Sequence, residues 1–280
     1  MRRYRSPGRR HGGPGGWQIT ADRAGQRIEP ERTALCLDFD GTLAPIVTDP
    51  EAARALPGTA ALLGRLAGRF AAVALVSGRP ASFLATHAAA PGVRYFGHYG
   101  LEEIHDGEVT VDPRLAATAG AVRAATVDLQ DSPAVRGSGA YLEDKGYTVA
   151  VHLRQARDPV RWAGPVEAAA REIAARHGLV ILPGRLVWEL RPPVQSDKGD
   201  AVRRVVAAAA AQAAVMVGDD RGDLPAFAVV SELAAAGGGG LRVAVRSPEA
   251  PAELLAAADL VVDGPEGVRA FLEDLLGAVA

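Results

Sequence analysis

Short apolar runs alternate with alanine-rich stretches along most of this 280-residue chain, and this alternation limits the possible folds more than any other feature. The runs are almost continuously apolar, which is typical of parallel strands buried on both faces. The alanine-rich stretches between them have the length and composition of helices, so the pattern predicts an α/β fold with a parallel sheet. The expected strands are 33–39, 70–77, 214–219, 241–246 and 259–264, and the expected helices are 57–69, 198–212 and 251–258.

The middle of the chain differs, because its apolar and polar residues alternate over short distances. Residues 139–154 are expected to form two strands around a turn at Lys145–Gly146, with the period of two that marks a sheet with two distinct faces. A helix is expected at 166–178. Residues 179–192 are expected to form a second hairpin with its turn at Pro183–Gly184.

These patterns divide the chain into three expected parts. The first residues are basic and rich in glycine and proline, and they lack the apolar segment of a signal peptide, so we expect a flexible tail. The middle block is expected to be an α+β insertion within the α/β domain. The four glycines at 237–240 are expected to form a loop. The expected bounds are 1–30 for the tail, 31–107 with 190–280 for the core domain, and 108–189 for the insertion.

Composition excludes several classes of protein. The formal net charge is -2, so there is no general electrostatic basis for binding nucleic acid. No apolar run approaches the roughly 18 uncharged residues of a membrane span, so no membrane partner is expected. The single cysteine, Cys36, lies in an apolar strand, cannot form an internal disulfide and fits a reducing compartment. The missing signal segment predicts a cytoplasmic protein.

Polar residues gather where the expected strands end. The first strand ends at Asp38 and Asp40 in "ALCLDFDGTLAP", and a strand end is a poor place to solvate two neighbouring acids without a partner. Ser77 ends the second strand, and Lys198 opens a helix. Ligands of parallel α/β sheets bind beyond the carboxyl ends of the strands. The third expected strand, 214–219, ends at Asp219, and Asp220 and Asp223 follow it.

This set of groups suits phosphoryl transfer. Magnesium takes oxygen ligands and keeps several waters, so one or two carboxylates are enough to hold it. Ser77 and Lys198 can hold phosphate oxygens while a carboxylate attacks phosphorus and forms an aspartyl-phosphate. A second acid nearby can protonate the leaving oxygen and then activate water.

The stretch "DFDGTL" at 38–43 resembles the signature of the haloacid dehalogenase superfamily of phosphohydrolases. The serine, the lysine and "GDDRGD" match the other three motifs in order, and the resemblance covers about residues 33 to 275. It implies a Rossmann-like parallel-sheet core with an inserted α+β cap of the C2 type. It also implies Asp38 as nucleophile, Asp40 as general acid and base, and Ser77 and Lys198 on the phosphate.

The same resemblance implies a magnesium cofactor. Its expected ligands are Asp38, the backbone carbonyl of Asp40, and Asp219. Asp220 is a further candidate ligand. Asp223 is expected either to reach the metal through water or to orient Lys198, and the sequence leaves these two alternatives open.

Three stretches, 95–104, 142–154 and 186–201, resemble trehalose-6-phosphate phosphatases. They carry Gly-x-x-Gly-x-Glu, Glu-x-Lys, His-x-Arg and Glu-x-Arg-Pro patterns, and charged side chains make strong hydrogen bonds to sugar hydroxyls. The resemblance implies a functional link to a trehalose-6-phosphate synthase. The expected substrate-binding residues are Thr42, Gly78, Arg79, His98, Gly100, Glu102, Glu143, Lys145, His152, Arg154, Glu189 and Arg191.

The fourth motif departs from the common subfamily form, Gly-Asp-Asp-x-Thr-Asp-Glu. Gly222 replaces the threonine and Leu224 replaces the glutamate, which weakens the assignment of the substrate and leaves the metal acids in place. The alternatives are a phosphatase for sucrose phosphate or a glycosyl-3-phosphoglycerate, a catalytically inactive sugar-phosphate sensor, and a phosphotransferase or mutase.

Overall fold

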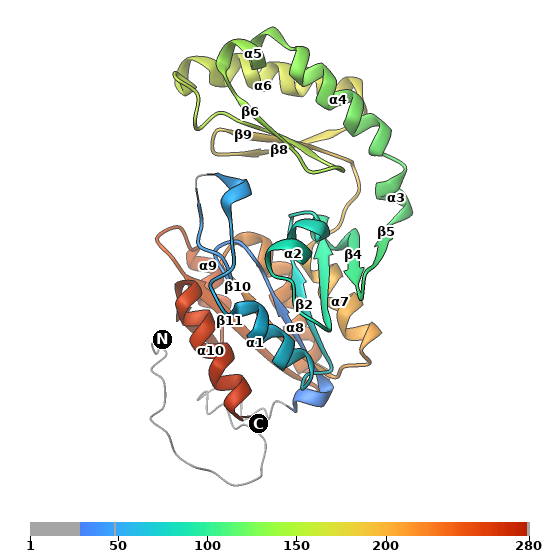
Figure 1. The fold of residues 1–280 in the computed structure, drawn as a ribbon, viewed down its shortest axis with the longest axis vertical. Helices are drawn as coiled ribbons and strands as arrows, with labels where there is room; N and C mark the ends of the chain where they lie inside the picture. Colours follow the sequence, from blue (N-terminus) through green and yellow to red (C-terminus); the bar gives the residue numbers. More distant parts are fainter. Residues whose placement is uncertain (1–28, 48, 279–280) are drawn as a thin grey trace. The chain divides into compact units, whose positions relative to one another are not determined.

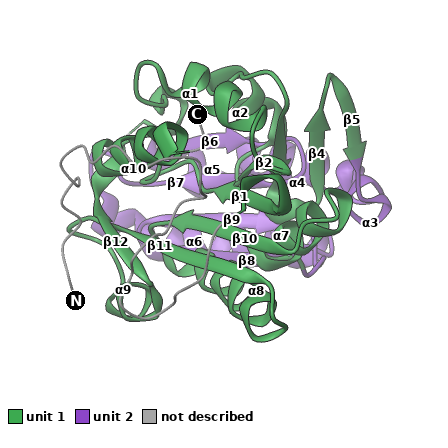
Figure 2. Ribbon diagram, turned by 90° about the horizontal axis from the view of Figure 1, so that it is seen from below, with its two compact units in different colours: residues 1–110, 196–280 green, residues 111–195 purple. Residues whose placement is uncertain are grey.

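The computed structural model describes residues 29–47 and 49–278, so nearly all of the expected tail, 1–30, lies outside the described residues. The chain forms two compact units (Figure 2). Among the described residues, unit 1 comprises 29–47, 49–110 and 196–278, and unit 2 comprises 111–195. The boundary expected at 189–190 falls inside strand β9, Val187–Arg191.

Unit 1 contains an eight-stranded sheet in the order β12-β11-β10-β1-β2-β3-β4-β5 (Figure 1). The strands from β12 to β3 are parallel to their neighbours, and β4 runs antiparallel to β3. This confirms the α/β fold. The strands are β1 Thr33–Leu37, β2 Ala72–Val76, β3 Val93–Gly97, β4 Glu102–His105, β5 Glu108–Val111, β10 Ala213–Gly218, β11 Gly239–Arg246 and β12 Leu260–Asp263.

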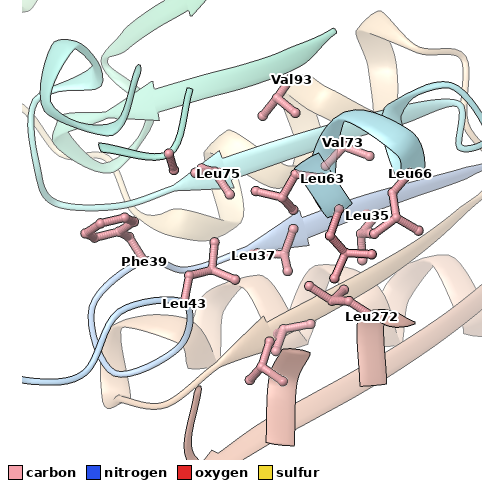
Figure 3. Close-up of a cluster of buried hydrophobic side chains, with 14 of the residues drawn as sticks. Leu35, Leu37, Phe39, Leu43, Leu63, Leu66, Val73, Leu75, Val93 and Leu272 are labelled. Carbon is pink, nitrogen blue, oxygen red and sulfur yellow. The ribbon is translucent and has the colours of Figure 1, made fainter. Parts of the chain in front are cut away.

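Helices cover both faces of this sheet, which explains why its strands are apolar at successive positions. In β1, Leu35 and Leu37 join one buried cluster (Figure 3), whereas Ala34 and Cys36 join another on the opposite face. Helices α1 and α10 pack in the first cluster, and α7, α8 and α9 pack in the second. The α-helices of unit 1 are α1 Thr59–Ala67, α2 Ala81–His87, α7 Lys198–Ala208, α8 Leu224–Ala235, α9 Ala252–Ala257 and α10 Gly264–Ala278. Short 3-10 turns are η1 Pro30–Arg32, η2 Pro50–Ala52, η3 His98–Gly100 and η4 Arg221–Asp223.

The expectation of a loop at 237–240 was wrong for its last two residues, because β11 begins at Gly239. A Cβ atom on Gly240 would lie 2.6 Å from a methyl carbon of Val230 on α8. Glycine therefore allows this strand to lie against the helix.

Unit 2 contains a four-stranded antiparallel sheet in the order β6-β7-β9-β8, with helices packed on one face. The buried cluster includes Val149, Val151 and Leu190 from the strands and Ile173 from α6. The strands are β6 Tyr141–Asp144, β7 Val149–His152, β8 Val180–Gly184 and β9 Val187–Arg191, and the helices are α3 Pro113–Ala116, α4 Ala119–Asp131, α5 Pro133–Ser138 and α6 Pro159–Arg176.

The expected position of the second turn was wrong. Gly184 pairs with Val187, so the turn is at Arg185 and Leu186, and Leu186 has a φ of +59°. Pro183 lies within β8, which is an edge strand of this sheet and tolerates a residue without an N–H. Within the described ranges, 29–47 and 49–278, no helix combines the length and apolar character needed to span a membrane.

Candidate active site

The site begins where β1 ends. The N–H of Asp38 donates to the carbonyl of Val217 on β10 at 2.9 Å, which continues the parallel pairing by one residue. Phe39 is fully buried in the core (Figure 3), and its carbonyl accepts from the N–H of Leu43 at 2.8 Å and of Ala44 at 2.9 Å. The chain therefore turns tightly around Phe39 and carries an acid on each side of it.

Lys198 lies among the acids that follow β1 and β10. Its Nζ is 2.8 Å from Asp38 Oδ1 and 2.7 Å from Asp223 Oδ1, and Asp220 Oδ1 is 3.8 Å away. Lys198 is the first residue of α7, whose N-terminus is capped by the Asp197 side chain. The Lys198 side chain is only 5% exposed, so its ion pairs with the buried Asp38 and Asp223 are shielded from water.

Burial and like charge shift the pKa values of this cluster. Burial raises the pKa of Asp38 well above its usual value, with Lys198 opposing the shift and the neighbouring acids adding to it. Burial, together with Asp223 and Asp220, raises the pKa of Asp219 to about 7. Burial alone would lower the pKa of Lys198, but Asp223 and Asp38 outweigh it and raise that pKa well above its usual value.

The donor atoms of the cluster fit a hard cation. Asp38, Asp219 and Asp223 each offer one carboxylate oxygen, and these oxygens lie within 4.8 Å of one another. Lys198 is one positive charge among several acids, and an all-oxygen set is what Mg²⁺ prefers. Asp223 Oδ1 accepts from Lys198, and its Oδ2 accepts from the N–H groups of Asp219 at 2.9 Å and Asp220 at 3.0 Å. Of the two alternatives for Asp223, this geometry favours orienting Lys198.

In the absence of divalent metal, the stability of the protein should fall as the pH rises. The pKa of Asp219 in the folded protein, about 7, exceeds the value of about 4 for an exposed aspartate. The folded state therefore binds more protons between these two values, and stability falls as the pH rises through this window. In EDTA we expect a higher Tm at pH 5 than at pH 8, and Mg²⁺ should raise the Tm more at pH 8.

Thermal unfolding with EDTA or Mg²⁺ at both pH values measures this directly. Asp219→Asn is the control that should reduce both effects. An equal or larger effect of Mg²⁺ at pH 5 would contradict the prediction.

The second acid of the first motif has a different partner. Asp40 accepts two hydrogen bonds from Arg79, from Nε to Oδ2 and from Nη2 to Oδ1, both at 2.8 Å. Its side chain is 36% exposed, in contrast to the buried Asp38. The structure therefore brings Asp38, Asp219 and Asp223 together with Lys198, whereas the Asp40 carboxylate lies in a separate ion pair.

Gly41 allows the turn between these two groups. Its φ is +73°, and a Cβ atom on it would lie 2.0 Å from Asp219 Oδ2. Gly41→Ala should therefore displace the Asp219 carboxylate and lower activity by roughly 10²-fold, the typical effect of misplacing a reacting group by about 1 Å. Gly58→Ala is a matched control, because Gly58 has a φ of +86° with no atom near the added Cβ.

Both alanines impose left-handed strain, at a cost of about 1–2 kcal/mol. Only Gly41→Ala should raise the Mg²⁺ concentration needed for half-maximal activity. Equal loss in the two variants would mean that the strain, and not the displacement of Asp219, is responsible.

The serine loop that follows β2 and the glycine-rich turn η3 are joined by hydrogen bonds beside the first motif. Ser77 is buried, and its Oγ accepts from the N–H of Arg79 at 3.2 Å. The carbonyl of Ser77 accepts from the N–H of Tyr99, and that of Arg79 accepts from the N–H of His98. Glu102 Oε2 accepts from the N–H of Ala81 at 2.7 Å and so satisfies the start of α2. Burial raises the pKa of Glu102, and the bond from Ala81 opposes this shift.

Sequence reasoning did not identify Tyr99, which the structure places at the centre of these contacts. Its φ is +58°, in the left-handed region that bulky residues rarely adopt. A Cβ atom on Gly78 would lie 2.7 Å from the Tyr99 ring, and the carbonyl of Tyr99 accepts from Ser196 Oγ at 2.8 Å. No glycine or asparagine marks this strained position, so the sequence carries no local signal for it.

The remaining candidates of unit 1 lie near these loops. His98 Nε2 is buried and 4.0 Å from Glu102 Oε2. Gly100 has a φ of +91° and lies against Ala201 of α7. Thr42 is fully buried, and within the described part of the chain its Oγ1 has no hydrogen-bond partner. A buried hydroxyl without a partner is rare in proteins and indicates a position that a ligand can satisfy.

The candidates of unit 2 form a charged network on one face of its sheet. Glu143 and Glu189 both lie opposite Ala150, on either side of β7. Lys145 Nζ is 3.7 Å from Glu143 Oε2 and 3.5 Å from Glu189 Oε2, and His152 Nε2 is 2.8 Å from Glu143 Oε2. The structure therefore brings these four side chains together.

The two expected arginines of unit 2 have backbone partners. Arg154 is exposed beyond the end of β7, and its Nε donates to the carbonyl of Arg185 at 3.3 Å. Arg191 lies in β9, and its Nη2 donates to the carbonyl of Val194 at 3.5 Å.

A parallel α/β sheet with paired acids after β1, a serine after β2, a lysine opening α7 and three acids after β10 defines a protein of the haloacid dehalogenase class. The chain belongs to the trehalose-phosphatase family, whose model matches residues 36–257. It is 35% identical over 249 residues to a trehalose-phosphate phosphatase of Mycobacterium tuberculosis, covering 86% of this chain and 61% of the relative. It is 37% identical over 211 residues to that of Mycobacterium avium, covering 70% of this chain and 51% of the relative.

Solved structures share the fold. A trehalose-6-phosphate phosphatase related protein has a TM-score of 0.70 and 23% identity, over 87% of this chain and 97% of that chain. The C-terminal domain of C. albicans trehalose-6-phosphate phosphatase has a TM-score of 0.68 and 22% identity, over 89% of this chain and 94% of that chain. The chain spans 61% or less of the length of the two curated mycobacterial relatives described above.

Proposed function

We propose that this protein is a magnesium-dependent phosphatase that hydrolyses trehalose 6-phosphate to trehalose and phosphate through an aspartyl-phosphate. The observation that supports this most strongly is the buried cluster of Asp38, Lys198, Asp219 and Asp223 in a chain of the trehalose-phosphatase family. A nucleophilic carboxylate beside a fixed cation is the arrangement that phosphoryl transfer needs.

In the proposed reaction, a carboxylate oxygen of Asp38 attacks phosphorus, and the bond to the sugar oxygen breaks. Asp40 gives a proton to that oxygen, so trehalose leaves as a neutral alcohol. Asp40 then takes a proton from a water that attacks the same phosphorus, which releases phosphate and regenerates the Asp38 carboxylate. Lys198, Ser77 and the hydroxyl of Thr42 hold the phosphate oxygens.

Asp38, Asp219 and the backbone carbonyl of Asp40 would hold the magnesium ion, and Asp220 is exposed beside them. When bound, the ion supplies positive charge that offsets the charge of the phosphoryl oxygens. The clustered, like-charged carboxylates support this assignment, because a cation removes their mutual repulsion.

Acid quenching during turnover tests the proposed intermediate. Phosphate from radiolabelled trehalose 6-phosphate should become attached to the peptide that contains Asp38, through a bond that hydroxylamine cleaves. With radiolabelled p-nitrophenyl phosphate, whose leaving group needs no proton, Asp40→Asn should increase the trapped fraction, because it then slows only the water step. Labelled phosphate on another residue, or steady release of phosphate with none trapped in either protein, would contradict this chemistry.

We propose that unit 2, which contains most of the insertion expected at 108–189, selects the sugar. Its support is the network of Glu143, Lys145, His152 and Glu189, because charged groups on one sheet face suit an array of hydroxyls. Arg191 lies in the same strand as Glu189, two residues away, and so shares its face. Gly78, His98, Gly100 and Glu102 are further proposed substrate-binding residues within unit 1, and Arg154 is one within unit 2.

Lys145→Ala and Arg191→Ala test this assignment. Each should lower kcat/KM for trehalose 6-phosphate by about 10-fold to 200-fold, the range for one or two lost polar contacts, with little effect on p-nitrophenyl phosphate. Arg171→Ala is the control, because Arg171 pairs with Glu167 on the exposed side of α6. Equal losses on both substrates would mean that these residues support the fold of unit 2.

A related sugar-phosphate phosphatase is the second candidate, favoured by Gly222 and Leu224 in the fourth motif. A Cβ atom at Gly222 would lie 3.1 Å from Asp220 Oδ1, and Leu224 packs against the core as the first residue of α8. Neither residue replaces a polar group of the cluster.

We further propose a cytoplasmic enzyme linked in function to a trehalose-6-phosphate synthase, because sugar phosphates are made in the cytoplasm.

A further inference from the structure

We propose that Arg79 is a positioning residue for Asp40, and that it sets the orientation of the general acid and base. This inference rests on the proposed phosphatase function, in which Asp40 exchanges protons with the sugar oxygen and with water. It assigns Arg79 a different role from the substrate contact expected from the sequence. The geometry that supports it is the forked pair between Arg79 and Asp40.

The fork fixes the plane of the Asp40 carboxylate. Two parallel N–H···O bonds of 2.8 Å hold both oxygens, whereas a single bond would leave the group free to rotate. Asp40 is 36% exposed and lies in a loop, so little else around it restricts its side chain as tightly. The lone pairs that face away from Arg79 therefore keep a defined direction, which proton transfer to a bound substrate requires.

Arg79 is itself held on two further sides. Its Nη1 donates to the carbonyl of Pro50 at 2.8 Å, so each of its three nitrogens has a protein acceptor. Its guanidinium lies 4.4 Å from the centre of the Phe83 ring, and Phe83 packs edge-on against the buried Phe39 at 5.8 Å. The orientation of Asp40 is thus tied to the hydrophobic core through Arg79 and Phe83.

A phosphate contact would use the guanidinium differently. A guanidinium that binds a phosphate directs two of its N–H groups to that ligand, and these are the groups that the Asp40 carboxylate occupies here. The phosphate has Lys198 as a positive partner in the buried cluster. Arg79 is therefore placed to act on the reaction through Asp40.

The test compares two esters with different leaving groups. Alkyl esters such as trehalose 6-phosphate need a proton on the leaving oxygen, whereas p-nitrophenolate leaves without one. The readout is the rate of leaving-group release in the first turnover, which precedes the water step. Arg79→Ala should slow this release by about 10²-fold for trehalose 6-phosphate and by less than about 3-fold for p-nitrophenyl phosphate.

Two further variants separate positioning from charge. Arg79→Lys keeps the charge and lacks the fork, so it should be nearly as slow as Arg79→Ala on trehalose 6-phosphate. Adding Arg79→Ala to Asp40→Asn should cause no further loss, because a residue that acts only through Asp40 has nothing left to position. Arg94→Ala is the matched control: Arg94 pairs with Glu103, away from the acids, and its loss should affect both esters equally.

Three results would overturn the proposal: equal slowing of both esters, rescue by Arg79→Lys, or additive losses in the double variant. A fall in Tm with both esters slowed alike would show that Arg79 serves only the fold. If the unaltered protein hydrolyses a different alkyl phosphate, the proposed substrate fails and that ester replaces trehalose 6-phosphate in the comparison. If it hydrolyses no phosphate ester, both proposals fail.

Discussion

Asp38→Asn is expected to lower turnover by at least about 10⁴-fold while the protein remains folded, because the change removes the proposed nucleophile. The amide is close in size to the carboxyl and fills the same buried space. Burial and the like charges of Asp223, Asp219 and Asp220 raise the pKa of the Asp38 carboxyl, so a neutral amide also removes this repulsion. Lys198 keeps its hydrogen bond to Asp223 at 2.7 Å. Steady-state kinetics with a thermal unfolding curve measures both expectations.

Asp263→Asn is the matched control for this variant. Asp263 also lies at the carboxyl end of a parallel strand, β12, but its side chain is 64% exposed and pairs with Arg246. It should keep turnover within about 2-fold, as expected for a surface change. Activity retained in Asp38→Asn would mean that another group attacks phosphorus.

Lys198→Met is expected to remove activity and to destabilise the protein by roughly 3–5 kcal/mol, the range for breaking a buried ion pair. Asp38 and Asp223 would remain buried without their cation. Their pKa values would rise further, so at pH 5 the acids should take up protons, and the loss of stability should be smaller than at pH 8. Denaturant unfolding at the two pH values measures this difference.

Arg203→Met is the control on the same helix. Arg203 pairs with Glu232, and both side chains are at least half exposed, so the cost should stay below about 1 kcal/mol. A loss in Lys198→Met that is equally small, or independent of pH, would show that Lys198 is not the main charge partner of the acids.

The sequence predicted the fold of unit 1 well because of the physical chemistry of its strands. A parallel strand between two helical layers must be apolar on both faces, as Leu35 and Cys36 show, and few other structures produce such runs. The same rule located the acids, since the carboxyl ends of parallel strands meet at one edge of the sheet. The ends of the strands, the order of the motifs and the residues of the buried cluster could therefore be predicted from local sequence patterns.

Other features depend on contacts between distant residues, which a single sequence does not specify. Nothing near Arg79 indicates that it binds Asp40, 39 positions earlier in the chain. Tyr99 is held in its strained backbone conformation because its N–H donates to the carbonyl of Ser77 and its carbonyl accepts from Ser196 Oγ. The turn expected at Pro183–Gly184 lies instead at Arg185–Leu186, because the edge strand β8 accepts the proline, which pairs with Trp188.

The most direct test of the proposed function is magnesium-dependent phosphate release from a panel of esters. The panel consists of trehalose 6-phosphate, sucrose 6-phosphate, glucose 6-phosphate, glucosyl-3-phosphoglycerate and p-nitrophenyl phosphate. We expect kcat/KM to be highest for trehalose 6-phosphate, and EDTA should abolish release. Preference for another sugar would retain the chemistry of Asp38 and refute the assigned substrate. No release from any ester in Mg²⁺ would contradict the phosphatase function and favour a sugar-phosphate sensor.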